Sequence, residues 1–401
     1  MQQNNFMRDK IRGCLMAGAA GDALGYKVEF MSHRAILSRF GKQGITKFAL
    51  GNNGKALISD DTQMTLFTAN GLLYGITEKR IHPQIALDEP EYLIMAAYLD
   101  WYYTQTGEKG KHKQITWLRE LPEMAHRRAP GNTCMSACSS MMYSDKIVNN
   151  SKGCGGIMRV APMALLVDQS PDSDRYYCSL EELAEGGCYI AEQTHQHPLG
   201  ALPAGLLTVL LYKLLPLTPT QAKENIVNIV SETLSILDVI RVDKYEEDKQ
   251  YLKDLTNKAV LLTHSDISDA DAIRELGEGW VAEETWAIAL YCAIRHIDNV
   301  EDAIIASVNH DGDSDSTGSV CGNIMGAIYG YEDIKNRNIF CPEGRELEDT
   351  IELSEIILAL ADDLSTGCTL TSSLLRHQRT PESKQWFERY VLMKPTGIGV
   401  K

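Results

Sequence analysis

The sequence predicts an all-α protein that folds as a single compact multi-helix domain. Apolar residues recur with helical spacing through most of the 401 residues, whereas the strict alternation of a half-buried strand is nearly absent. The best strand candidate is the short stretch 45–50. A strand–helix–strand rhythm and a glycine-rich phosphate loop with its lysine are both missing, which argues against the common nucleotide-binding domains built on a parallel sheet.

The helical pattern divides into segments joined by short polar connections. We expect helices near residues 8–24, 59–75, 85–103, 132–143, 157–167, 179–196, 200–214, 219–238, 244–262, 281–297, 300–307, 316–330, 347–364 and 381–391. None of the connections is long enough to separate two independent cores. One domain is therefore expected over residues 8–395, with surface insertions near 104–114, 168–177 and 239–250.

Two of the expected helices carry a small residue at every fourth position. The two sets are Gly13, Ala17, Gly21 and Gly25 in the first helix, and Gly318, Gly322, Gly326 and Gly330 in helix 316–330. Residues four apart lie on one face of a helix, so each set forms a bare stripe that another backbone can approach closely. A glycine inside a helix costs about 1 kcal/mol relative to alanine. A close contact should offset that cost, and we expect the two stripes to pack against each other.

Two helices are expected to begin among acidic and small residues. The starts are Asp311, Asp313 and Asp315 before helix 316–330, and Ser59-Asp60-Asp61 at the start of helix 59–75. Carboxylate and hydroxyl oxygens suit hard divalent cations. The same residue types also cap helix N-termini without any metal. Two such starts in one chain favour carboxylates that converge on a shared metal site.

Several separated motifs make the chain resemble the ADP-ribosylglycohydrolase family. In the family's order they are Gly21-Asp22-Ala23-Leu24-Gly25 with Glu29, Ser59-Asp60-Asp61-Thr62, Gly153 to Pro162, Thr194-His195-Gln196-His197-Pro198, and Gly312-Asp313-Ser314-Asp315-Ser316. The resemblance implies an all-α fold whose cleft binds ADP-ribose and two Mg²⁺ or Mn²⁺ ions.

The resemblance also implies roles for the acidic residues. The implied metal ligands are Ser59, Asp60, Asp61, Asp313, Asp315 and Ser316, with serine at two positions where typical relatives have threonine. The implied catalytic residues are Glu29, Asp60 and Asp315, because the family's glutamate lies beside the metals and the scissile bond. Asp22 is expected to be structural, and Asp311 lies outside the matched motif.

Substrate binding is expected at a glycine-rich loop and a histidine. The loop consists of Gly153, Cys154, Gly155 and Gly156, before a helix expected from residue 157. Backbone N–H groups and the positive end of a helix dipole suit phosphate oxygens. Relatives often carry asparagine where Cys154 stands, so a side-chain contact is not expected there. By resemblance, His195 lines the ADP-ribose pocket.

Asn132 is the most informative departure from the family pattern. Some arginine-processing relatives carry an aspartate there, and an amide cannot act as a base. Asn132 could therefore tune the linkage that is cut, or it could only cap a helix that begins at Thr133.

The function implied by the resemblance is metal-dependent hydrolysis of the N- or O-glycosidic bond between ADP-ribose and a protein side chain, with arginine expected over serine. The alternatives are a hydrolase of serine-linked or free ADP-ribose derivatives, an immunity protein that blocks an ADP-ribosyltransferase, and a catalytically dead structural relative. Intact aspartates at positions 60, 61, 313 and 315 argue against the last. The expected partners are an ADP-ribosylated protein and ADP-ribose.

Composition narrows the classes of partner. A formal net charge of −15 argues against binding to nucleic acid or to an anionic membrane surface. The ten cysteines show no metal-finger spacing. Residues 1–12 lack the apolar run of a signal peptide, and the most apolar stretch, 201–217, is interrupted by proline and lysine. These features predict a cytoplasmic protein with reduced thiols.

Overall fold

The computed structural model describes residues 2–82, 90–108, 112–144, 146–166, 179–370 and 380–398. Within these ranges the regular structure is helical, and the only β-type pairings are two isolated bridges, Ala56 with Ile351 and Gly153 with Val281. The all-α prediction is confirmed. The stretch 45–50 forms no strand, although Phe48 N–H donates to the Phe340 carbonyl at 2.9 Å. The insertion expected near 168–177 lies outside the described residues.

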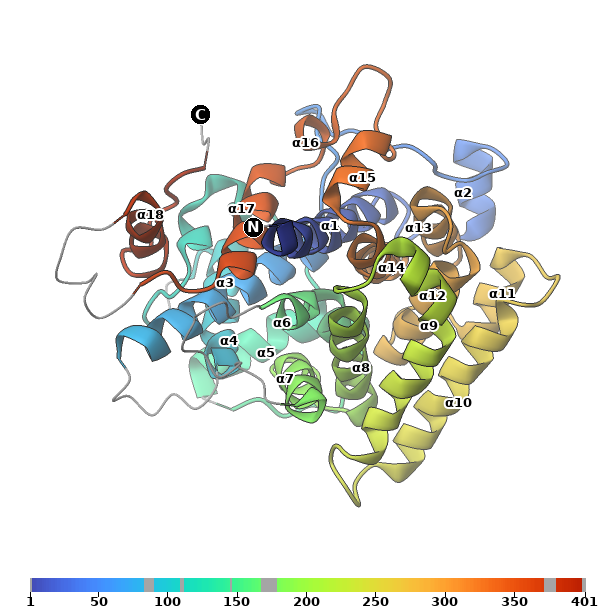
Figure 1. The fold of residues 1–401 in the computed structure, drawn as a ribbon, viewed down its shortest axis with the longest axis horizontal. Helices are drawn as coiled ribbons and strands as arrows, with labels where there is room; N and C mark the ends of the chain where they lie inside the picture. The colour runs from blue at the N-terminus through green and yellow to red at the C-terminus, as the bar shows by residue number, and fades with distance from the viewer. Residues whose placement is uncertain are drawn as a thin grey trace.

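The helices follow one another through the whole described chain (Figure 1). The α-helices are α1 (Gln2–Gly25), α2 (His33–Phe40), α3 (Asp60–Ile81), α4 (Ile94–Thr106), α5 (Asn132–Ser144), α6 (Ala161–Leu165), α7 (Leu180–Glu192), α8 (Pro198–Leu214), α9 (Pro219–Leu234), α10 (Glu246–Leu262), α11 (Asp269–Leu276), α12 (Ala282–Arg295), α13 (Val300–Val308), α14 (Ser314–Tyr329), α15 (Tyr331–Arg337), α16 (Leu347–Thr350), α17 (Ser354–Thr366) and α18 (Pro381–Tyr390). Short 3₁₀ helices are η1 (Pro90–Leu93), η2 (Trp117–Glu120), η3 (Pro122–Ala125), η4 (Cys154–Arg159) and η5 (Ser235–Asp238).

Helices α1 and α14 lie side by side near the middle of the molecule, with α3, α12 and α17 around them (Figure 1). A Cβ atom built on Gly21 would lie 2.0 Å from the Gly318 carbonyl oxygen, and one on Gly322 would lie 2.1 Å from that of Ala17. One on Gly326 would lie 2.1 Å from the Gly13 carbonyl oxygen. Early residues of α1 face late residues of α14, so the pair is antiparallel and the backbones touch along several turns. The predicted contact between the two stripes is confirmed.

Several helix boundaries differ from the expected ones. The helix expected over 157–167 is instead η4 followed by the short α6, because Pro162 lacks an N–H and fits only the first turn of a new helix. Helix α3 continues to Ile81, six residues beyond its expected end. In the insertion expected near 239–250, residues from Glu246 onward belong to α10, and Lys249 is buried there.

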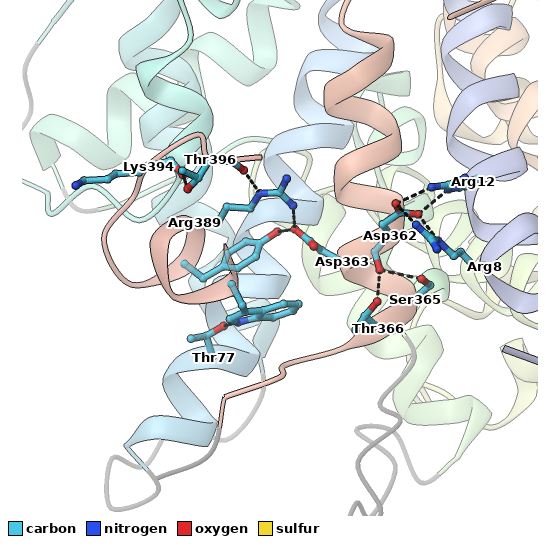
Figure 2. Close-up of polar contacts among 12 residues, drawn as sticks. Arg8, Arg12, Thr77, Asp362, Asp363, Ser365, Thr366, Arg389, Lys394 and Thr396 are labelled. Atoms are coloured by element: carbon cyan, nitrogen blue, oxygen red, sulfur yellow. Dashed lines mark hydrogen bonds and ion pairs between the residues drawn. The ribbon is translucent and has the colours of Figure 1, made fainter. Parts of the chain in front are cut away.

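The C-terminal part of the chain is bonded to the central helices through two neighbouring aspartates of α17 (Figure 2). Asp362 accepts hydrogen bonds from Arg8 and Arg12 of α1. Asp363 accepts from Arg389 at 2.6 Å and from the Tyr390 hydroxyl at 2.7 Å, both on α18. Because α17 is bonded to α1 through Asp362 and to α18 through Asp363, α18 belongs to the same packed body as α1.

In the parts of the chain that the structure describes, none of the helices has the length and apolarity needed to cross a bilayer.

Candidate functional site

Three chain segments bring the predicted acidic residues to one place. The turn after α1 carries Glu29, the start of α3 carries Asp60 and Asp61, and the start of α14 carries Asp313 and Asp315. All five side chains are buried. The antiparallel contact of α1 with α14 places the end of the first helix beside the start of the second, which is why residues so far apart in sequence meet.

The start of α3 is held by a carboxylate of α1. Asp22 accepts the N–H of Ser59 at 2.9 Å, the N–H of Thr62 at 3.1 Å and the Thr62 hydroxyl. Ser59 is itself the N-cap of α3, since its hydroxyl accepts the N–H of Asp61 at 3.1 Å. The structural role expected for Asp22 is confirmed, and the predicted ligand Ser59 uses its oxygen as a helix cap in this structure.

The start of α14 is linked to the glycine-rich loop. Asp313 is the N-cap, with one carboxylate oxygen accepting the N–H of Ser316 at 3.2 Å. Its other oxygen accepts the Cys154 thiol, with 2.8 Å between sulfur and oxygen. Asp311 points elsewhere and accepts the N–H of His33 at 2.9 Å, so it stands apart from the cluster.

The carboxyl groups of the cluster influence one another strongly. Burial raises the pKa of Glu29 to about 9, and the negative charges of Asp313 and Asp60 add to this. Burial, above all, raises the pKa of Asp60 to about 8, and it also raises the pKa values of Asp61 and Asp315. Two buried oxygens, Glu29 Oε2 and Asp61 Oδ2, have no hydrogen-bond partner. Buried like charges with unpaired oxygens are costly unless a positive charge accompanies them.

The donor chemistry of this cluster fits hard divalent cations, because every predicted ligand offers oxygen and two buried oxygens are unpaired. Among the described residues, however, no three histidine, cysteine, aspartate or glutamate side chains already stand in the arrangement of a metal site. The binding of two cations therefore stays a prediction.

The glycine-rich loop is fixed by a segment that the sequence did not point to. Cys154 N–H donates to the Trp280 carbonyl at 3.2 Å, and Ala282 N–H donates to the Lys152 carbonyl at 2.9 Å. The N–H of Cys154 is therefore already used, and the phosphate contact expected of the loop as a whole stays a prediction. A Cβ on Gly156 would lie 2.7 Å from that of Ala191, so this glycine is needed for packing against α7.

The same segment also holds α14 in place. Asp313 N–H donates to the Glu278 carbonyl at 2.8 Å. Gly279 and Gly312 have φ angles of 82° and 115°, which only glycine adopts without strain. These two glycines are the sequence signal that could have indicated this contact. Beside it, the rings of Phe30 and Trp280 stack with centroids 5.9 Å apart.

His195 is buried against the loop as a neutral ring. Burial, reinforced by the charge of Arg159, lowers the pKa of His195 to about 3. Arg159 donates to the Thr194 hydroxyl oxygen at 2.6 Å, and that hydroxyl lies 2.8 Å from His195 Nδ1. In the tautomer in which the Thr194 hydroxyl donates to Nδ1, the ring proton is on Nε2. A Cβ on Gly153 would lie 3.1 Å from that Nε2 atom.

Arg159 and Asn132 also lie near the cluster, in different roles. Arg159 is completely buried, with its guanidinium 4.3 Å from the centre of the Tyr98 ring, so it supports Thr194 from inside the core. Asn132 is the exposed first residue of α5, which begins where helix 132–143 was expected to begin. The preceding Gly131 N–H donates to Asp60 Oδ2 at 3.1 Å, so Asn132 stands next to the carboxylate cluster.

Comparisons with known proteins identify relatives of this chain. The family model described as ADP-ribosylglycohydrolase matches residues 3–391. The mouse protein named ADP-ribosylhydrolase ARH3 is 26% identical over 372 residues, covering 86% of this chain and 90% of that protein. The human protein of the same name is 25% identical over 222 residues, or 51% of this chain and 57% of its own length. A solved structure titled ADP-ribosylglycohydrolase-related protein complex aligns with a TM-score of 0.52 at 21% identity, covering 90% of this chain and 98% of that chain.

Proposed function

The chain belongs to the ADP-ribosylglycohydrolase family, and on that basis we propose that it hydrolyses the glycosidic bond between ADP-ribose and a protein side chain. The observation that carries this proposal is the cluster of five buried carboxyl groups, two of them with unpaired oxygens, next to a glycine-rich loop and a neutral histidine. A cluster of this kind would be costly to keep for stability alone.

The proposed cation ligands are the oxygen-bearing residues at the starts of α3 and α14. They are Ser59, Asp60, Asp61, Asp313, Asp315 and Ser316. When bound there, two Mg²⁺ or Mn²⁺ ions would attract ribose hydroxyls and lower the pKa of a water molecule.

The carboxylates also suit the charge that develops in the reaction. Breaking the bond at the anomeric carbon gives the ribose positive, oxocarbenium-like character, which neighbouring negative groups stabilise. Water then adds to that carbon, and its proton passes to Glu29 or Asp60, the two acidic groups proposed as bases. The side-chain nitrogen or oxygen keeps the bond electrons as it leaves, and the same carboxyl group passes the proton from water on to it. Asp315 lies beside Glu29, and each of the two carboxyl groups affects the pKa of the other.

The nucleotide part of the substrate is proposed to lie along the loop 153–156. Gly153 and Gly155 allow the loop backbone to pack directly on the buried His195 ring, since a Cβ on Gly155 would lie 2.7 Å from that ring. In the tautomer with its proton on Nε2, His195 would offer a neutral donor to a diphosphate or ribose oxygen. Cys154 contributes its thiol contact with Asp313, so it links the loop to the proposed cation ligands.

We propose arginine-linked over serine-linked ADP-ribose as the substrate. A carboxylate-rich cluster suits a guanidinium group. Asn132 at its edge counts the other way, because an amide binds a guanidinium less strongly than a carboxylate does.

The test is release of ADP-ribose from two matched peptides, one modified on arginine and one on serine, with Mg²⁺ and with a chelator. We expect release that depends on the cation and is faster from the arginine-linked peptide. Faster release from the serine-linked peptide would contradict the proposed linkage. No release from either peptide by correctly folded protein would contradict the proposed reaction.

A further inference from the structure

A small void lies between α1, α3 and α14, behind the carboxylate cluster. It leaves about 10 Å³ for the centre of a water molecule, which is enough for one. Three polar side chains line it together with Asn323: Thr62 and Thr65 from α3, and Ser319 from α14. All of these residues are buried.

Asn323 gives the void an unsatisfied acceptor. Its amide nitrogen donates to the Cys14 carbonyl at 2.9 Å, which fixes the orientation of the amide, because only the nitrogen can donate. The amide oxygen, Oδ1, is buried and has no partner. A buried acceptor without a donor costs about 1–3 kcal/mol.

Gly18 explains how Asn323 reaches this position. Gly18 is outside the four-residue stripe of α1, and a Cβ there would lie 2.1 Å from the Asn323 amide nitrogen. The missing side chain therefore makes room for the amide between the two helices, and the void opens beyond it.

The hydroxyl groups around the void can complete a hydrogen-bond network. Thr62 donates its proton to Asp22, and Thr65 donates to the Asp61 carbonyl at 2.8 Å. Each of these oxygens can still accept a hydrogen bond, whereas Ser319 can donate one. Together with Asn323 Oδ1, the void offers a water molecule between two and four partners, as buried waters usually have.

We propose that this void holds one ordered water molecule, which donates to Asn323 Oδ1 and to a threonine hydroxyl of α3 and accepts from Ser319. The water completes a chain from Asn323 through Thr62 and Asp22 to the Ser59 N–H, joining the three helices behind the cluster. A metal ion does not fit, because hard cations require six or more oxygen ligands and Leu15, Leu66 and Ile357 line the rest of the void. This inference does not depend on the proposed reaction.

The direct test is a high-resolution crystal structure of the whole protein. We expect one isolated density peak about 2.7–3.2 Å from Asn323 Oδ1 and from at least one of the hydroxyl oxygens. An empty void would overturn the proposal. So would a peak with contacts near 2.0–2.4 Å, which would indicate a cation.

A matched pair of variants gives an independent test through the direction in which Tm changes. Ser319→Ala leaves room for the water, whereas Ser319→Val fills the void and leaves Asn323 Oδ1 unpaired. The same two substitutions at the exposed Ser231 of α9 measure the difference in helix propensity alone. We expect Tm to fall from alanine to valine by about 2 °C more at position 319 than at position 231. An equal or smaller fall at position 319 would mean that the void is dry, because filling a dry void stabilises the fold.

Discussion

Asp22 and Ser59 are joined by a hydrogen bond of 2.9 Å from the Ser59 N–H to the Asp22 carboxylate, which fixes the start of α3 to α1. The carboxylate also accepts two hydrogen bonds from Thr62. Burial raises the pKa of Asp22 to about 6, and the hydrogen bonds from Thr62 and Ser59 oppose this rise. These donors stabilise the buried carboxylate. The position of Asp60 and Asp61 therefore depends on a residue of another helix.

Replacing the Asp22 carboxylate should lower activity, although Asp22 is not one of the predicted site residues. In Asp22→Asn the single amide oxygen cannot accept hydrogen bonds from all three donor groups. This loss should lower the free energy of unfolding by about 1–3 kcal/mol. Because α3 then shifts, ADP-ribose release should fall about 10–100-fold. The control is Asp269→Asn at the start of α11, which loses acceptors for Tyr291 and His296 far from α3. Equal activity of the two variants would contradict the positioning role of Asp22.

The glycine contact between α1 and α14 predicts a second positioning effect. A leucine at position 322 would press on the Ala17 carbonyl, which is backbone and cannot move aside. Overpacking typically costs about 1–3 kcal/mol, and a shift near 1 Å at the carboxylates can cost about 100-fold in rate. Unfolding in urea and ADP-ribose release should be measured on Gly322→Leu.

Gly51→Ala is the control for that variant. The atoms nearest to a Cβ at position 51 would belong to the side chains of Leu57 and Asn53, which can adjust. We expect it to keep its activity. If Gly322→Leu were as active as Gly51→Ala, the helix contact would not be what positions the carboxylates.

The glycine stripes could be predicted from the sequence because their cause is local: a glycine every four positions in a helix has few explanations other than close contact. Asp22 could be assigned a structural role for a similar reason, as a carboxylate inside a glycine-rich helix. The contact of Cys154 with Trp280 could not be predicted, since it joins segments over 120 positions apart and leaves no periodic signal. The 3₁₀ turn of η4 was also missed, because the pattern of apolar residues does not separate it from an α-helix.

His195 should make stability depend on pH. Its pKa is lowered from 6.5 to about 3 in the fold, so between these values the unfolded chain binds the proton and the folded chain does not. Stability that is fully present above pH 6.5 is therefore lost as the pH falls toward 3. Between pH 7.5 and pH 5 the loss due to this residue should be about 2 kcal/mol.

The measurement compares urea unfolding of the unmodified protein and His195→Gln at both pH values. Other acidic groups contribute equally to the two proteins, so the difference isolates the histidine. A drop in stability of the same size in both proteins would show that His195 is not held neutral by the fold.

Asn132 should affect the choice of linkage. Asn132→Asp adds a carboxylate beside Gly131, whose N–H binds Asp60. We expect cleavage of the arginine-linked peptide to rise about tenfold relative to the serine-linked one, because an ionised partner strengthens a hydrogen bond to a guanidinium. An unchanged ratio of the two rates would leave Asn132 as only the first residue of α5.

The central claim is that the starts of α3 and α14 together hold divalent cations for hydrolysis of an ADP-ribosyl bond. Anomalous scattering from crystals grown with Mn²⁺, prepared from protein that releases ADP-ribose, tests it most directly. We predict two peaks among Asp60, Asp61, Asp313 and Asp315, and their loss in Asp61→Asn together with most of the activity. An active protein whose crystals show no manganese at these carboxylates would contradict the claim.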